Sequence, residues 1–223
     1  MDGPDPSKGR KRSELPGDFP VFPLAGALLL PHGKLPLNIF EPRYLAMVED
    51  ALAERRCIGM IQPDETRAPG ETGPALYRVG CLGRLVSFSE TNDGRYLITL
   101  AGLSRFRVEQ EMQPRRVYRR VRASFGAFVT DLDPAETPLR DRDGLLDALR
   151  AYFQAQGFDA NWEAIEGMDD DALVVTLAMV CPFNTAEKQA LLEAPTADER
   201  AQALLALLRM GAHEIRAGGP TLS

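Results

Sequence analysis

The pattern of hydrophobic and polar positions changes once along the chain, from strand-like to helical. Between residues 18 and 130, short apolar or alternating runs are interrupted at close intervals by Gly, Pro and Asp, which is typical of strands joined by turns. Beyond residue 143, apolar residues recur at three- and four-residue spacing, which is typical of amphipathic helices. The sequence therefore predicts an α+β fold, in which a small β domain precedes a helical bundle.

Six strands and one helix are predicted in the β domain. The helix is expected to begin at Pro42, because proline suits the first helical position, and to end near Arg55. Gly80 and Gly102 lie inside predicted strands, where glycine indicates a bend, and Asp93-Gly94 is typical of a hairpin turn. Bent strands with short connections predict a small closed or half-closed barrel. The predicted strands are residues 19–24, 35–40, 57–62, 76–89, 95–108 and 117–129.

The net charge changes at the same place as the pattern. Residues 15–130 carry a net charge of +3 and residues 131–223 carry −10, which argues for two structural units. The N-terminal residues are polar and predict a disordered tail, and the acid- and proline-rich stretch between the two patterns predicts a linker. The predicted segments are a tail at 1–17, a β domain at 18–130, a linker at 131–143 and a helical subdomain at 144–217, with helices at 144–156, 169–180, 184–193 and 197–217.

Composition excludes several classes of protein. The 223 residues are 44% hydrophobic and 26% charged, which is ordinary for a globular chain. The longest apolar stretches, 24–31 and 173–183, are shorter than the roughly 20 residues that a membrane helix needs. Cys57, Cys81 and Cys181 are odd in number and far apart, so no disulfide framework is expected. We expect a cytoplasmic protein, and the 22 Arg against 4 Lys are typical of a GC-rich bacterial genome.

The sequence offers no clear catalytic motif. His32 and His213 have no partner at metal-ligand spacing, so neither a metal nor a cofactor is expected. The segment 26–34 is similar to a phosphate-binding loop, but six residues separate its glycines instead of four, and Leu35 stands where Ser or Thr would bind Mg²⁺. Cys81 with His32 is an alternative nucleophilic pair, against the simpler interpretation of a buried cysteine. We expect no enzyme activity.

Several segments, in order and at matching spacing, resemble the Lon protease N-terminal (LON substrate-binding) domain family. The resemblance covers roughly residues 18–210, and although each segment is weak alone, their order is specific. The matching segments are FPVFPL at 19–24, LPLNIFEPRY at 35–44, IGMIQ at 58–62, LYRVGCLGRL at 76–85, DG at 93–94 and LAGLSRF at 100–106, followed by helical segments at 187–193 and 200–208.

The resemblance implies a PUA-like β pseudo-barrel followed by a helical subdomain. In complete Lon proteases this region captures unfolded or tagged substrates, and an ATPase module and a Ser-Lys protease domain follow it. Neither of those domains is recognised in this sequence, so the chain is expected to be a stand-alone bacterial member that is not an enzyme. The implied function is a polypeptide-binding module, acting as an adaptor or regulator of proteolysis, with a protease or another protein as partner.

The expected binding site combines apolar and polar residues. Three consecutive leucines, Leu28, Leu29 and Leu30, cannot all face a core from a strand, so a loop is expected to expose more than one of them. Arg43 and Tyr44 could line the rim of a groove or could simply start a helix. Gly102 and Arg105 could admit and clamp a bound chain, or could form a strand bend and a structural ion pair.

RNA is the alternative partner. Residues 105–122 carry a net charge of +5, which fits a nucleic-acid surface, a solvated face or a docking surface for the acidic half of the chain. Tyr118 is the single aromatic residue in 115–122 available for stacking on a base, and the pI is about 5.1. An extended or unfolded polypeptide is therefore the preferred partner, and no membrane partner is expected.

Overall fold

The first part of the chain folds as a six-stranded mixed sheet that closes into a ring. The computed structural model describes residues 15–70, 72–114, 116–132 and 138–216. The chain divides into two units, Met1–Ala135 with Pro182–Thr185, and Glu136–Cys181 with Ala186–Ser223. The first unit, called the β unit here, contains β1 (Asp18–Pro23), β2 (Lys34–Ile39), α1 (Pro42–Ala53), β3 (Cys57–Ile61), β4 (Val79–Glu90), β5 (Tyr96–Met112), β6 (Arg120–Ser124) and the 3₁₀ segment η2 (Gly126–Leu132).

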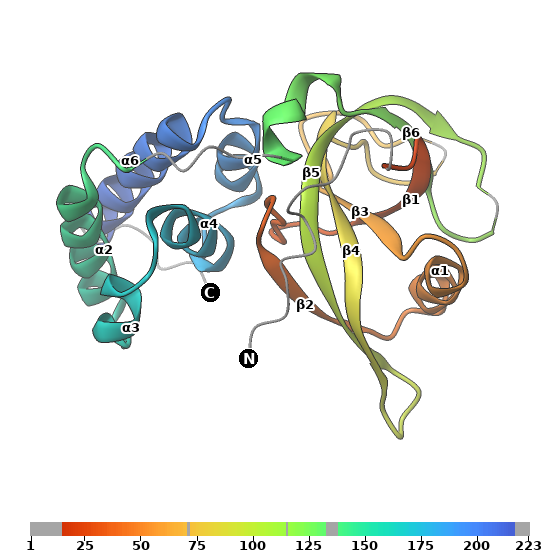
Figure 1. Ribbon diagram of the computed structural model, residues 1–223, viewed down its shortest axis with the longest axis horizontal. Coiled ribbons are helices and arrows are strands. Elements are labelled where there is room, and N and C mark those ends of the chain that lie inside the picture. Colours follow the sequence, from red (N-terminus) through yellow and green to blue (C-terminus); the bar gives the residue numbers. More distant parts are fainter. Residues whose placement is uncertain (1–14, 71, 115, 133–137, 217–223) are drawn as a thin grey trace. The chain divides into compact units, whose positions relative to one another are not determined.

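The length of β5 allows the ring to close. The strand order is β2-β5-β4-β3-β1-β6, and β5 also pairs with β6 (Figure 1). The first residues of β5 pair with β2, from Tyr96 opposite Ile39 to Ala101 opposite Lys34. Its last residues pair with β6. Register shifts interrupt the pairing of β4 and β5, and one of them adjoins Gly102, whereas Gly80 pairs in regular register with Phe106. The predicted fold class, an α+β chain with a β pseudo-barrel and C-terminal helices, is confirmed.

The core of the β unit is built around two phenylalanines. The rings of Phe19 and Phe106 meet edge to face with centroids 4.9 Å apart. A Cβ at Gly80 would lie 2.5 Å from the Phe106 ring, so this glycine makes room for the core. Leu15 is also buried in this cluster, and the Gly17 carbonyl accepts a hydrogen bond from Ala123 N at 3.0 Å. The predicted tail is therefore wrong at residues 15–17, and its residues 1–14 lie outside the described part.

The predicted linker and last strand also differ from the structure. The strand expected at 117–129 is only five residues long, and η2 follows it. Asp131, at the expected start of the linker, is buried in η2, and α2 already begins at Arg142. Residues 133–137 of the predicted linker lie outside the described residues. The structured chain thus continues further on both sides of the linker than expected.

The helices that the structure describes after η2 are α2 (Arg142–Gln156), α3 (Trp162–Glu166), α4 (Asp170–Val180), α5 (Thr185–Glu193) and α6 (Ala197–Arg216). Apart from Thr185, they belong to the second unit, called the helical unit. Thr196 and Glu199 form the predicted capping box, because each side chain bonds the other residue's backbone N–H at 3.1 Å. Among the helices that the structure describes, none has both the length and the apolar character to cross a membrane.

Two buried cations satisfy helix C-termini inside the helical unit. Lys188 Nζ in α5 donates to the Met179 carbonyl at the end of α4, at 3.3 Å. Arg200 Nε in α6 donates to the Leu191 carbonyl at the end of α5, at 2.9 Å. Carbonyl groups in a last helical turn lack helical partners, and a cation there also interacts well with the helix dipole. Lys188 and Arg200 lie in the two helical segments that resemble the Lon N-terminal domain, and these contacts give both residues a structural role.

Candidate functional site

The structure brings together the predicted residues Leu28, Leu29, Leu30 and Gly102, but it buries them. The three leucines are 2%, 1% and 0% exposed. The segment at 28–33 passes so close to β5 that a Cβ at Gly102 would lie 1.9 Å from the Leu30 carbonyl oxygen. Gly102 also accepts from His32 N at 3.1 Å and donates to the Gly33 carbonyl at 2.8 Å. We call residues 28–33 with Gly102 the leucine crossing, and the expectation that it exposes apolar surface is wrong.

Of the two interpretations of Arg105, a clamp for a bound chain or a structural ion pair, the structure shows the ion pair. Its guanidinium Nη2 lies 2.8 Å from Asp131 Oδ1, and its backbone N–H donates to Asp131 Oδ2 at 2.8 Å. Both side chains are less than a tenth exposed, and the guanidinium lies 4.7 Å from the centre of the Phe128 ring. The Asp131 carbonyl oxygen is 3.1 Å from His32 Nε2, so the same residue also holds the leucine crossing. Arg105 is therefore a buried structural residue.

Arg43 and Tyr44 form a separate group at the start of α1. Arg43 is exposed, pairs with Glu41 at 2.8 Å and lies over the Tyr44 ring at 4.6 Å. Tyr44 is buried against Phe22, with ring centroids 4.2 Å apart. Burial raises the pKa of the Tyr44 hydroxyl. The helix-start interpretation accounts for these contacts, and a role of Arg43 and Tyr44 at the rim of a groove stays a prediction.

Exposed apolar side chains of the β unit gather instead on and beside the β4–β5 hairpin, whereas Val117 and Val129 are exposed elsewhere in the unit. Phe88 and Leu97 are 41% and 45% exposed, Val86 is 44% exposed, and Phe40, just after β2, is 61% exposed. We call these four residues the hairpin patch. Because Leu97 is opposite Ser89 in the pairing, Phe88 and Leu97 face opposite sides of the hairpin. Figure 1 shows that the end of this hairpin extends beyond the rest of the β unit.

The hairpin patch is held on an ordered scaffold. The Tyr96 ring packs against Phe88 with centroids 5.0 Å apart, and its hydroxyl donates to Glu49 of α1 at 3.1 Å. Arg95 lies over the Phe40 ring at 5.7 Å. The turn closes through a hydrogen bond of 3.0 Å from Gly94 N to the Thr91 carbonyl. The signal in the sequence that could have revealed the hairpin patch is the presence of apolar residues on both faces of the strands beside the hairpin turn.

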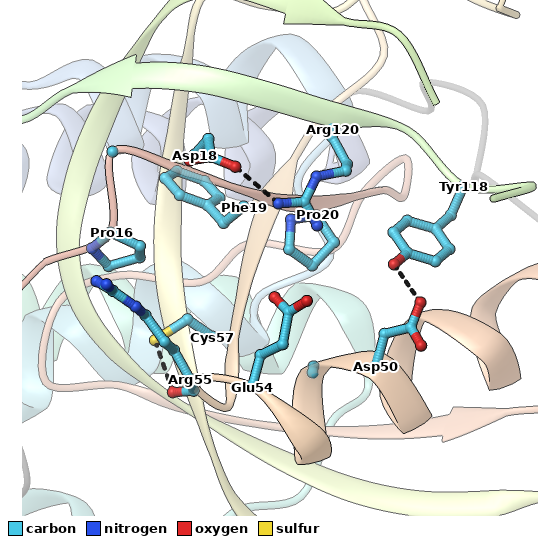
Figure 2. Close-up of a pocket in the computed structure, with 12 residues that line it drawn as sticks. Pro16, Asp18, Phe19, Pro20, Asp50, Glu54, Arg55, Cys57, Tyr118 and Arg120 are labelled. Atoms are coloured by element: carbon cyan, nitrogen blue, oxygen red, sulfur yellow. Dashed lines mark hydrogen bonds and ion pairs between the residues drawn. The ribbon is translucent and has the colours of Figure 1, made fainter. Parts of the chain in front are cut away.

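A small polar pocket lies between the start of β1, the end of α1 and the start of β6. Its volume is about 160 Å³. Figure 2 shows Arg120 paired with Asp18, at 2.8 Å, and the Tyr118 hydroxyl donating to Asp50, at 2.6 Å. Burial and the hydrogen bond to Asp50 raise the pKa of Tyr118. These polar groups pair with one another and line much of the pocket, whereas an anchor side chain of a polypeptide needs a mainly apolar pocket.

Arginines between residues 105 and 122 are largely engaged with acids of the β unit. Arg107 and Arg122 are exposed, and Arg115 lies outside the described residues. Hydrogen bonds from Arg119, supported by Thr72, lower the pKa of Glu111. This use of the charges favours a structural interpretation over an RNA surface. The pairs are Arg105–Asp131, Arg116–Asp50, Arg119–Glu111 and Arg120–Asp18.

Groups that could hold a metal or act as a nucleophile were also located. Within residues 15–70, 72–114, 116–132 and 138–216, no cluster of three or more His, Cys, Asp or Glu could bind a metal ion. Cys57, Cys81 and Cys181 are buried, and none of these three described residues forms a disulfide. Burial raises the pKa of the Cys181 thiol to about 12, so it is protonated at neutral pH. The buried position of Cys81 fits the simpler of its two interpretations.

The closed β ring followed by packed helices is the fold of Lon N-terminal domains. The family model described as "ATP-dependent protease La (LON) substrate-binding domain" matches residues 18–210, so the chain belongs to this family. The resemblance seen in the sequence is thereby confirmed. A crystal structure of a Lon N-terminal domain protein from Xanthomonas campestris has a TM-score of 0.59 and 25% identity, and the match covers 85% of this chain and 97% of that one.

Further matches agree. The N-terminal domain of a Mycobacterium avium complex Lon protease has a TM-score of 0.60 at 18% identity, covering 86% of this chain and 97% of that one, which shows the fold alone. Lon protease 2 of Sorangium cellulosum is 34% identical over 106 residues, 47% of this chain and 13% of that protein. Lon protease 1 of Bdellovibrio bacteriovorus is 26% identical over 200 residues, 86% of this chain and 24% of that protein. The chain thus spans at most a quarter of the length of these relatives.

Proposed function

We propose that this chain binds unfolded or extended segments of other polypeptides through the hairpin patch, as an adaptor or regulator of proteolysis in the cytoplasm. Membership of a substrate-binding domain family supports the class of ligand. The observation that carries the site is the exposure of large apolar side chains on ordered strands. Exposed apolar groups are unfavourable in water and often mark a binding surface.

Binding combines apolar burial with pairing of the backbone. An extended segment would cover Phe88 or Leu97, depending on the face of the hairpin that it meets. Among the described strands, β2 ends the sheet order and has β5 as its neighbour. Its other edge could accept a strand of the ligand, in the β-augmentation mode. Pro36 in β2 fits an edge position, because proline cannot donate a ladder hydrogen bond.

The proposal assigns binding, and no catalytic step, to residues 18–210. The matched family model is that of a substrate-binding domain, and the relatives that share this region are named as Lon proteases. A protease that receives the bound segment is therefore the proposed partner. Arg43, which is exposed and follows Phe40 by three residues, is a candidate rim residue for the same surface.

A titration with a permanently unfolded protein, reduced and alkylated and carrying a fluorophore, tests the proposal. Leu97→Glu is expected to weaken binding by about fivefold or more, because a charge replaces an apolar anchor. Val117→Glu is the matched control, since Val117 is 70% exposed and lies outside the hairpin. Equal affinity of the two variants, both folded by circular dichroism, would contradict the site. Tighter, salt-dependent binding of single-stranded RNA would support the alternative partner instead.

A further inference from the structure

The helical unit carries a cluster of aromatic side chains at its surface, where α2 meets α3. The Phe153 ring contacts Phe158 nearly at a right angle, with centroids 5.7 Å apart, and Trp162 with centroids 5.8 Å apart. Phe158 is 46% exposed, and Phe153 and Trp162 are half-buried. Trp162 is the single tryptophan of the chain. Large aromatic residues at a surface are enriched in binding sites, where they act as anchors.

The backbone of α3 is fixed by polar contacts, independently of the exposed ring of Phe158. The α3 helix has no buried residue. Arg142 Nη2 donates to the Glu166 and Met168 carbonyls at 2.8 and 2.7 Å. Asn161 Oδ1 caps the helix by accepting from Ala164 N at 3.1 Å. Trp162 of the aromatic cluster is thus presented on a positioned helix, which limits the entropy lost when a ligand binds.

One cation of the chain already uses this surface. The Arg150 guanidinium lies over the Trp162 ring, 5.3 Å from its centre. Its Nη1 lies 3.1 Å from Asp147 Oδ1, and its Nη2 pairs with Glu166. The arrangement shows that the ring and its neighbouring carboxylates accept a guanidinium by cation–π attraction and ion pairing.

The segment that carries the cluster has an excess of negative charge in its sequence. From Asp147 to Glu166 the chain has four acids and one base, a net charge of −3. Asp159 and Glu163 are exposed, and they flank the aromatic residues in sequence. Exposed acids close in sequence to aromatic rings are complementary to a positively charged ligand, because their potential raises the rate of encounter and disfavours acidic ligands.

We propose that this surface, made of Phe153, Phe158 and Trp162 with Glu163 at its rim, binds an arginine- or lysine-bearing segment of an extended polypeptide. The ligand cation would lie against an aromatic face and pair with the Glu163 carboxylate, while its aliphatic stem covers Phe158. The site belongs to the helical unit, whereas the hairpin patch, which offers apolar anchors, belongs to the β unit. It would therefore add a preference for basic segments that the hairpin patch does not supply.

The fluorescence of Trp162 provides a direct readout, because no other tryptophan contributes. The full chain is titrated with four short Gly-Ser peptides that differ only in carrying Arg, Lys, Gln or Glu at the same positions. The Arg and Lys peptides are expected to give a saturable change in emission that weakens with added salt. The Gln and Glu peptides are expected to give none. A saturable change with the Gln peptide, or none with the Arg peptide, would overturn the proposal.

Two charge reversals separate local recognition from long-range attraction. Glu163→Lys is expected to weaken binding of the Arg peptide by about fivefold or more. Glu214→Lys, at an exposed position in α6, changes the net charge equally and is expected to leave the affinity within about twofold. Equal losses in the two variants would overturn the assignment of Glu163. If Glu163→Lys unfolds α3, Glu163→Gln with a smaller loss in the same direction serves instead.

Two further measurements separate this site from other sources of a signal. Leu97→Glu in the hairpin patch is expected to leave the Arg-peptide titration unchanged, so the two sites can fail independently. Sedimentation and Trp162 emission are also measured at several protein concentrations without peptide. The emission is expected not to change with any self-association of the chain. If emission instead follows a monomer–dimer equilibrium, the surface is an interface between copies of this chain and the proposal is overturned.

Discussion

Two apolar regions meet β5 a few residues apart, at Gly102 and at Leu97, and only one of them is shielded from water. The leucine crossing is 0–2% exposed at its three leucines, whereas Phe88 and Leu97 of the hairpin patch are 41% and 45% exposed. The difference comes from Gly102, where the missing side chain lets the backbone of residues 28–33 lie directly on the strand. An apolar run by itself therefore does not indicate a binding surface, because another segment of the chain can pack against it and bury it.

Polar contacts complete the burial of the crossing. Asp131 serves both sides, since its carboxylate binds Arg105 and its carbonyl oxygen lies 3.1 Å from His32. The hairpin has charged contacts as well, but these are at the surface, as in the pair Arg95–Asp93, whose side chains are 50% and 60% exposed. An arginine–aspartate pair is thus buried and structural at the leucine crossing, whereas on the hairpin it is exposed to solvent.

The largest effect is expected from Asp131→Ala. Removing the carboxylate leaves the Arg105 guanidinium buried without its partner, and the free energy of unfolding should fall by about 3–5 kcal/mol. Urea unfolding followed by circular dichroism measures the change. Asp93→Ala on the hairpin is the matched control and should shift the unfolding midpoint little. Equal shifts for the two variants would contradict the contrast between the two ion pairs.

The next effect is expected from Leu30→Ala. This leucine is fully buried, so the substitution leaves a cavity and should lower the free energy of unfolding by about 2–5 kcal/mol. The same denaturation measurement applies. A loss below about 0.5 kcal/mol, the range of an ordinary surface substitution, would show that the crossing is open and would restore the leucines as candidate binding residues.

Gly102→Ala tests the close approach itself. The new methyl group would meet the Leu30 carbonyl oxygen, which cannot rotate away as a side chain could. Displacement of the backbone should lower the free energy of unfolding by about 1–3 kcal/mol. Gly94→Ala is unsuitable as a control because its φ is +77°, whereas Gly17→Ala meets no atom within 4 Å and should be nearly neutral. A neutral Gly102→Ala would mean that the crossing segment lies further from β5.

Much of the fold could be predicted from the sequence because each long element carries a local pattern. The strands at β1, β2 and β3 and the helices α2, α4 and α5 were expected within about two residues at each end. The short helix α3 was missed, because its five residues have no buried face and therefore no apolar periodicity. The strand expected at 117–129 was too long, since η2 is apolar as well but turns at Phe128.

The site was harder to predict because burial depends on contacts between distant residues. The two interpretations of Arg105 could not be separated until its partner was known, and Asp131 had been assigned to a linker on its local composition. The leucines gave a strong local signal of exposure that one glycine, about 70 residues further along the chain, reverses. The hairpin patch, by contrast, follows an ordinary strand pattern that does not show whether anything covers it.

The smallest effect on stability is expected in the hairpin patch. Leu97 is almost half exposed, so Leu97→Ala should change the free energy of unfolding by less than about 0.5 kcal/mol. The same substitution should still weaken capture of an unfolded polypeptide, because truncating an anchor that becomes buried on binding costs about 1 kcal/mol or more. Leu30→Ala supplies the opposite combination, a large loss of stability with no loss of binding while the chain stays folded. If Leu97→Ala instead destabilises the chain as Leu30→Ala does, then both regions are core and the polypeptide-binding surface lies elsewhere.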